Sequence, residues 1–167
     1  DLEGGEISTD AGRTRAVVDV RLILLAEVTD CSQDRIRRGL AEAAEAAGLQ
    51  HVVWSTFSDT RKWLPISDDR MPVLLEKYNV PHFDAKGEAD AYFADRSVPT
   101  TYLLTSFYWE NFIYFGAGPQ RGEDGVLALT MPMGDKKLPS MAAEDIGRAA
   151  YGIFMAGDTF IGRTVGV

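Results

Sequence analysis

One dense apolar run does most to constrain the fold of this chain. Val17, Val18 and Val20 lead into the unbroken aliphatic stretch Leu22 to Leu25, with few polar interruptions. A strand has this composition when both faces of its sheet are covered, as in folds that alternate strands and helices around a parallel sheet. The run therefore predicts an α/β fold with a strand that starts at Ala16.

A predicted helix follows the run and leads to a second strand. Ser32 or Asp34 can cap this helix, and Gly48 can end it in a left-handed conformation. His51 to Thr56 is then a second buried strand. The inward face of the helix is expected at Ile36, Leu40, Ala43, Ala44 and Ala47.

Strand, helix and strand together form one βαβ unit, so the two strands are expected to run parallel. In such sheets, ligands bind beyond the carboxyl ends of the strands. These ends are Glu27 to Asp30 and Ser55 to Asp59. We therefore expect both segments to border a ligand-binding cleft.

Prolines interrupt the middle of the chain. Because Pro65 and Pro72 disfavour long helices, we expect only a short helix from Met71 to Tyr78. A longer amphipathic helix is predicted from Asp84 to Asp95. Its buried side is expected at Ala89, Tyr92 and Phe93.

The C-terminal half adds further strands and one long helix. Thr100 to Thr105 is β-branched and apolar, which predicts a third parallel strand, and a cluster of aromatic residues follows it. Another strand is predicted from Val126 to Met131, then a turn at Gly134 and Asp135. A helix is predicted from Ala143 to Met155, with an inward face at Ile146, Ala149, Ala150 and Ile153, and Phe160 to Val167 is expected to hold a last strand.

Composition excludes several classes of function. Seventeen Lys and Arg against 25 Asp and Glu give a net charge of −8, so direct binding to nucleic acid or to anionic membranes is not expected. Cys31 is the single cysteine, and with two histidines it makes no recognisable zinc pattern, so no metal site is predicted. The acidic start and the lack of a long apolar stretch predict a cytoplasmic protein.

Four stretches of the sequence form a distinctive set in a fixed order. They are His51-Val-Val-Trp-Ser-Thr56, Pro81-His-Phe-Asp-Ala-Lys-Gly-Glu88, Ser106-Phe-Tyr-Trp-Glu-Asn-Phe112, and Met131-Pro-Met-Gly-Asp135 leading to Ala143-Glu-Asp-Ile-Gly147. Together they resemble the NmrA-like family of atypical short-chain dehydrogenases. The resemblance covers residues 19–167 and implies a Rossmann-like parallel sheet with flanking helices that binds NADP or NAD.

The resemblance also indicates that part of the fold is absent. The family begins with a strand and a Gly-rich turn that holds the cofactor pyrophosphate, whereas Gly4 and Gly5 here follow no apolar strand and lack the required spacing. The last residues look like a strand that normally leads to further helices. We therefore expect one partial domain over residues 1–167, with residues 1–15 as a loop, that lacks the N-terminal phosphate-binding units and the C-terminal helices.

This chain has the lysine but not the tyrosine of the catalytic pair of ordinary short-chain dehydrogenases. That pair is Tyr-x-x-x-Lys, in which the lysine lowers the pKa of the phenol and contacts the nicotinamide ribose. Here His82 stands at the tyrosine position, and Lys86 follows four residues later. The resemblance implies that Lys86 contacts the ribose, and His82 is a candidate proton donor or a residue that only lines the pocket.

Other candidate cofactor contacts come from three places. Ser55 and Thr56 end the strand that carries the catalytic serine in the wider superfamily, and Arg38 occupies a helix where some relatives place a basic contact. By resemblance, the nicotinamide half of the cofactor is expected to be wrapped by Tyr108, Trp109, Glu110 and Asn111.

An apolar pocket is also expected, because aromatic and methionine side chains suit adaptable binding surfaces. Its candidates are Trp54, Phe57, Trp109, Phe112, Met131 and Met133, half of which are expected to belong to the core, and it would take an apolar or aromatic small molecule. The function predicted is a dinucleotide-binding redox sensor or regulator with a protein partner, and a homodimer is a further option. Two alternatives stay open, namely an atypical reductase of quinone-like or other aromatic substrates, and a packing or oligomerisation module that binds no dinucleotide.

Overall fold

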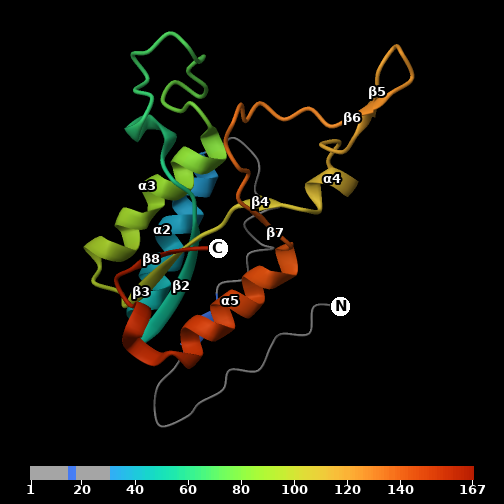
Figure 1. Cartoon of the computed structure of the whole chain (residues 1–167). Coiled ribbons are helices and arrows are strands. Elements are labelled where there is room, and N and C mark those ends of the chain that lie inside the picture. Colours follow the sequence, from blue (N-terminus) through green and yellow to red (C-terminus); the bar gives the residue numbers. More distant parts are fainter. Residues whose placement is uncertain (1–14, 18–30) are drawn as a thin grey trace.

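The computed structural model describes residues 15–17 and 31–167, and its centre is a sheet of four parallel strands (Figure 1). The strands lie in the order β1-β2-β3-β8. The predicted α/β fold with a parallel sheet is confirmed. The strands are β1 (Arg15–Val17), β2 (His51–Thr56), β3 (Thr100–Leu104) and β8 (Thr164–Gly166).

Only the start of the first predicted strand can be followed. Residues 15–17 pair in parallel with β2, with Ala16 opposite Val52. The aliphatic stretch Leu22 to Leu25, the expected cleft segment Glu27 to Asp30 and the expected loop over residues 1–14 lie outside the described residues. Arg15, which we placed at the end of that loop, belongs to β1.

Helices cover both faces of the sheet. α2 (Cys31–Ala46) and α3 (Pro81–Asp95) lie on one face, and α5 (Ala143–Met155) lies on the other (Figure 1). The alternation of side chains along β2 explains this layering, because successive residues of a strand point to opposite faces. Val52 and Trp54 pack with α2 and α3, whereas Val53 packs with α5.

The predicted inward face of α2 is confirmed at Leu40 and Ala44, which pack in the core, and is wrong at its other three residues. Ile36 is 49% exposed and Ala43 and Ala47 are also exposed, while Ala41 and Ala44 are buried. A polar contact between helices accounts for the difference. The hydroxyl of Tyr92 on α3 donates a hydrogen bond to Asp34, which turns the Asp34 side of α2 toward α3. Gly48 ends the region at φ +59°, as predicted.

Two predicted elements are wrong. Residues 71–78 form turns, with Leu75 at φ 49° and Glu76 at φ 65°, and the chain has instead a short 3-10 helix, η1 (Thr60–Lys62). Leu74 and Tyr78 exchange backbone hydrogen bonds across this turn, and the backbone N–H of Lys77 donates to the carbonyl of Leu74. The strand expected over 126–131 shrinks to β6 (Leu127–Ala128), which pairs with β5 (Gln120–Arg121) in an exposed hairpin and not with the central sheet.

The other predicted elements are confirmed with small shifts of their ends. β2, β3, α3 and α5 lie where the sequence pattern placed them, and Gly134 occupies the predicted turn at φ +58°. The remaining elements are β4 (Phe107–Tyr108), which pairs with β7 (Ser140–Met141), α4 (Asn111–Tyr114) and η2 (Gly157–Phe160). Among the described helices, none is long and apolar enough to cross a membrane.

Candidate functional site

Lys86 is a buried lysine that lies against the carboxyl end of β2. Its residue surface is only 5% exposed, although it lies on a helix that covers the sheet from outside. The Lys86 Nζ atom lies 3.4 Å from the Ser55 hydroxyl oxygen and 4.7 Å from the centre of the Phe57 ring. The structure therefore brings together the two predicted site residues Lys86 and Ser55.

The surroundings of Lys86 disfavour its charge. Burial, and to a smaller extent the positive charge of Arg37 on α2, lower the pKa of Lys86 to about 8. An ammonium group has three N–H donors, and Ser55 is its one hydrogen-bond partner in the described part of the chain. Lys86 can thus donate to hydroxyl or anionic oxygens of a ligand, which fits the diol of a ribose.

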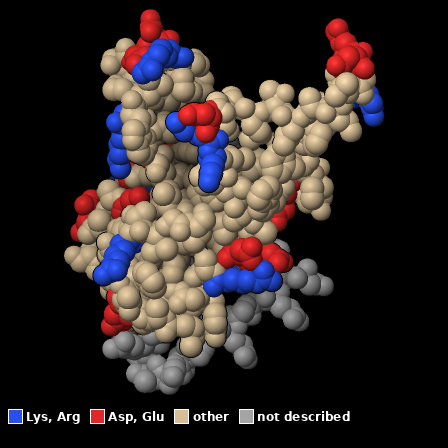
Figure 2. All heavy atoms as spheres, in the orientation of Figure 1, with Lys and Arg blue, Asp and Glu red and all other residues tan. Residues whose placement is uncertain are grey.

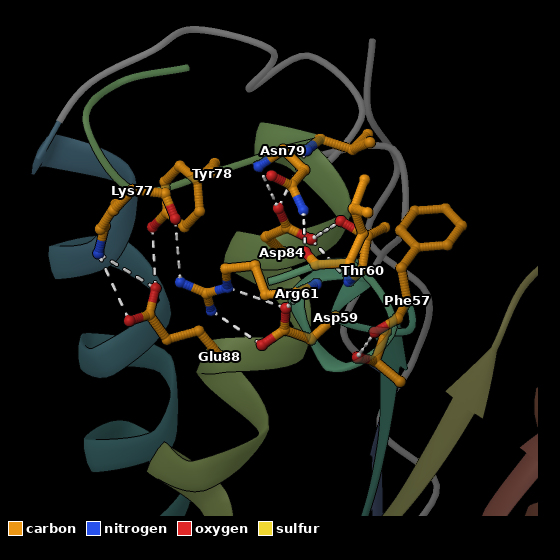
Figure 3. A network of polar contacts seen from close by, with 12 residues as sticks. Phe57, Asp59, Thr60, Arg61, Lys77, Tyr78, Asn79, Asp84 and Glu88 are labelled. Atoms are coloured by element: carbon orange, nitrogen blue, oxygen red, sulfur yellow. Dashed lines mark hydrogen bonds and ion pairs between the residues drawn. The ribbon is translucent and has the colours of Figure 1, made fainter. Parts of the chain in front are cut away.

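The segment that follows β2 is held onto α3 by a network of polar contacts (Figure 3). Asp84 lies at its centre and is fully buried. Its carboxylate accepts hydrogen bonds from the backbone N–H groups of Thr60 at 2.7 Å, Asn79 at 2.8 Å and Val80 at 3.0 Å, and from the Thr60 hydroxyl at 2.6 Å. This carboxylate therefore joins both ends of the loop over residues 57–80 to α3.

Arg61 forms a second set of contacts that joins the two ends of the same loop. Arg61 donates to both carboxylate oxygens of Asp59 at 2.9 Å, and another of its N–H groups donates to the carbonyl of Lys77 at 3.3 Å. This ion pair holds the pKa of Asp59 below its ordinary value. Figure 3 shows Arg61 between Asp59 and the ring of Tyr78.

The ends of β2 and β3 meet at one edge of the sheet. The backbone N–H of Thr105 donates to the carbonyl of Thr56 at 3.4 Å, and the hydroxyls of Thr105 and Tyr108 lie 3.3 Å apart. Tyr108 is buried, and this burial raises its pKa. The predicted residues Ser55, Thr56 and Tyr108 thus belong to one polar edge at the carboxyl ends of the strands.

Two other predicted site residues lie further from this edge. His82 is exposed on the first turn of α3, and its ring packs edge-on against the rings of Phe83 and Phe57. Arg38 is an exposed residue on the side of α2 that meets α3, where its guanidinium covers the Tyr92 ring at 4.6 Å and pairs with Asp34 at 3.4 Å. Arg37 is the basic residue of α2 whose charge affects Lys86.

In the aromatic stretch after β3, Trp109, Glu110 and Asn111 each make different contacts. Trp109 is 52% exposed and packs beside Phe112. The Glu110 carboxylate accepts hydrogen bonds from the backbone N–H of Ala143 at 2.9 and 3.0 Å, at the start of α5. Asn111 begins the short helix α4, and its carbonyl accepts from the backbone N–H of Ala117 at 3.2 Å. Contact of these three residues with a cofactor stays a prediction.

The six residues expected to line an apolar pocket do not share one environment. Trp54 is fully buried and stacks against Phe93 in the core beneath α3, so its assignment to a pocket wall is wrong. Its position inside a strand with both faces covered is the reason. Phe57 lies beside Lys86, Trp109 and Phe112 pack on each other, and Met131 and Met133 are half-buried.

Several residues around the site were not predicted from the sequence. Asp84 and Gly87 flank Lys86 in the same motif, but their contacts with residues 57–80 depend on the tertiary fold. Asp90 lies one turn later, and burial raises its pKa to about 6 while the Trp54 indole donates to it at 3.0 Å. An acidic residue within a predicted buried helix face is the signal that points to such positions.

Surface charge and potential metal ligands complete the description. On the face shown in Figure 2, Lys and Arg lie next to Asp and Glu in small groups, and they do not form a continuous basic stripe. Examples are the pairs Arg70 with Asp68 and Lys136 with Asp135. Within residues 15–17 and 31–167, no three His, Cys, Asp or Glu side chains form a group that could hold a metal ion.

Comparison with known proteins identifies the family. A model of the NmrA-like family matches residues 5–166. The crystal structure of NmrA, a negative transcriptional regulator, matches with a TM-score of 0.65 and 26% sequence identity over 80% of this chain and 40% of that one. A double mutant of NmrA matches with a TM-score of 0.63, the same identity and the same coverage, so this chain spans less than half of either. From its parallel sheet, its four motifs and these matches, we conclude that the chain belongs to the NmrA-like family.

Proposed function

We propose that this chain contributes the nicotinamide side of an NADP or NAD site in a regulatory protein that senses the dinucleotide without turning it over. The observation that carries the proposal is the buried Lys86 ammonium, which lies at the carboxyl edge of a parallel sheet. Of its three N–H donors, one has a hydrogen-bond partner, Ser55, in the described part of the chain. When bound, the dinucleotide would supply hydride chemistry, whereas Lys86 and Ser55 would bind and orient its ribose.

Several features support a regulatory role over ordinary dehydrogenase chemistry. The position of the usual catalytic tyrosine holds His82, which lies exposed at the start of α3. A similar protein, NmrA, is described as a negative transcriptional regulator. Because the net charge of −8 disfavours direct contact with DNA, we propose that regulation works through a protein partner in the cytoplasm.

Calorimetric titration of NADP and NAD into the chain tests this proposal. We expect binding that is weakened by about tenfold or more in Lys86→Met, which keeps the length of the side chain and removes its charge and its donors. Lys137→Met is the matched control, because Lys137 is an exposed lysine outside the site. Equal dinucleotide affinity of wild type and Lys86→Met would contradict the proposed contact between Lys86 and the ribose.

The same titration decides between the proposal and the packing module. No heat of binding from either dinucleotide, with a chain that is folded by circular dichroism, would favour a module that only packs or assembles. A regulator should bind NADP or NAD and show no oxidation of NADPH with a quinone acceptor. Binding together with turnover would indicate the reductase instead.

One observation favours the reductase as a second candidate. His82 precedes Lys86 by one helical turn and contacts Phe57, so both polar side chains flank the same aromatic ring. An imidazole in this position can deliver a proton near neutral pH. Loss of NADPH-dependent quinone reduction in both His82→Gln and Lys86→Met, with retained dinucleotide binding in His82→Gln, would establish this function.

A further inference from the structure

The backbone after β2 approaches α3 unusually closely at Gly87. A Cβ atom added there would lie 2.9 Å from both the Cβ and the backbone nitrogen of Asp59, and 3.0 Å from the carbonyl oxygen of Phe57. The two contacts at 2.9 Å are closer than real Cβ atoms tolerate, the third is unusually tight, and two of the three atoms belong to the backbone. Glycine at position 87 therefore allows residues 57–59 to lie directly on the helix, next to Lys86.

Asp84 fastens the same segment from the other side of Lys86. Its four accepted hydrogen bonds bind Thr60 and the residues before α3, and a carboxylate with this many donors has no need of a further partner. Within the described residues, Asp84 forms no hydrogen bond or ion pair with Lys86, so its effect on the lysine must pass through the loop over residues 57–80.

The side chain that this arrangement places beside the lysine is Phe57. Its ring stacks on Phe83 at 4.4 Å with an angle of 7° between the planes, and the Lys86 Nζ atom lies over it at 4.7 Å. The Phe57 ring thus shields the amine from water, with Phe83 as support. Arg37 on α2 is the charged group that acts on Lys86 from the neighbouring helix.

We propose that Gly87 and Asp84 are positioning residues that hold Phe57 as a fixed wall of the Lys86 site, so that the Phe57 ring keeps water from the amine. This inference deepens the proposed function, since it takes Lys86 as the ligand contact. Neither residue touches the ligand itself. Both act by fixing the backbone of residues 57–60 against α3.

The test measures the pH dependence of Lys86 acetylation by acetic anhydride, read by mass spectrometry on the intact folded chain without dinucleotide. In wild type we expect a midpoint near the pKa of about 8. Gly87→Ala displaces Phe57, admits water and should raise the midpoint by about one pH unit or more. Gly147→Ala in α5 is the matched control, because nothing lies within 4 Å of the added Cβ and its midpoint for Lys86 should stay that of wild type.

A second variant guards against misfolding of Gly87→Ala. Phe57→Ala removes the wall directly and should produce the same upward shift, and Asp84→Asn should move the midpoint in the same direction. An unchanged midpoint in a folded Gly87→Ala or Phe57→Ala chain would overturn the inference, as would an equal shift in Gly147→Ala. Because labelling needs no dinucleotide, failure of NADP and NAD to bind would refute the proposed function and leave the positioning result intact.

Discussion

Asp90 is a carboxyl group that the fold keeps partly out of water. It accepts a hydrogen bond from the Trp54 indole at 3.0 Å, and the Tyr102 hydroxyl donates to its backbone carbonyl at 3.4 Å. Burial is the main cause that raises the pKa of Asp90 to about 6, and hydrogen bonds from Thr56 and Trp54 oppose this shift. Folding therefore strengthens proton binding at this residue.

Asp90→Asn should stabilise the chain at neutral and higher pH. The pKa of Asp90 rises from its ordinary value of 3.8 to about 6 in the folded chain, so the protonated carboxyl favours folding. This contribution to the free energy of unfolding is fully present below pH 3.8 and is lost as the pH rises through about 6. We expect the variant to match wild type at pH 4 and to exceed it by about 1 to 2 kcal/mol at pH 8. Urea unfolding at both values measures this difference.

Asp69→Asn controls for the change in net charge, because Asp69 is an exposed aspartate in the loop over residues 57–80. Its free energy of unfolding should differ little from wild type at either pH. A stability difference for Asp90→Asn that does not depend on pH would contradict the burial of a titrating carboxyl.

At the scale of elements, α5 depends on a residue far away in the sequence. Its own N-cap, Ala142, has no side chain that can accept a hydrogen bond, and Glu110 supplies the acceptor for the Ala143 N–H instead. A carboxylate also interacts favourably with the positive end of the helix dipole. Glu110 thus joins the segment after β4 to the helix that covers one face of the sheet.

Glu110→Ala should destabilise the chain by about 1 kcal/mol, the usual cost of a lost N-cap. Thermal unfolding followed by circular dichroism measures the effect, and Glu123→Ala in the exposed hairpin serves as the control. Unchanged stability together with weaker dinucleotide binding would show that Glu110 acts on the cofactor and not on the helix.

The elements that the sequence predicted well are those whose side chains repeat with a clear period. β2 and α5 pack against partners that demand such a pattern, so their bounds could be predicted to the residue. The helix expected over 71–78 failed because local propensity ignores the loop contacts that Asn79 and Asp84 make. The strand over 126–131 failed because its apolar residues find no place in the central sheet, and Leu127 is 60% exposed.

The site could be predicted only where the sheet itself assembles it. Parallel strands end at one edge, which explains why Ser55 was expected there, whereas the place of Lys86 beside it was implied by the family resemblance. The position of Phe57 depends on the close approach at Gly87, and no short-range pattern encodes that approach. The charge that acts on Lys86 from α2 belongs to Arg37, and a cofactor contact of its neighbour Arg38 stays a prediction.

At the scale of the whole molecule, residues 109–130 form an arm that extends from the sheet (Figure 1). α4 exposes Ile113 at 73%, Tyr114 at 73% and Phe115 at 77% of their surfaces. Contiguous exposed apolar side chains of this kind favour association between protein surfaces. The homodimer that the sequence left as an option would have a surface here.

Sedimentation velocity should reveal self-association that increases with protein concentration. The double variant Ile113→Asp with Phe115→Asp should remain monomeric over the same range, because charged side chains resist desolvation. Met155→Asp changes an equally exposed apolar residue on α5 and should associate as wild type does. A wild-type chain that is monomeric at every concentration would contradict this prediction.

The order of the strands has a consequence for how the chain acquires its fold during synthesis. β3 pairs with β8 through Leu103 and Val165, and the backbone N–H of Tyr102 donates to the carbonyl of Arg163. Residues 164–166 must therefore be synthesised before this edge of β3 finds its partner. Until then a nascent chain presents an open strand edge, the kind of surface that chaperones protect from aggregation.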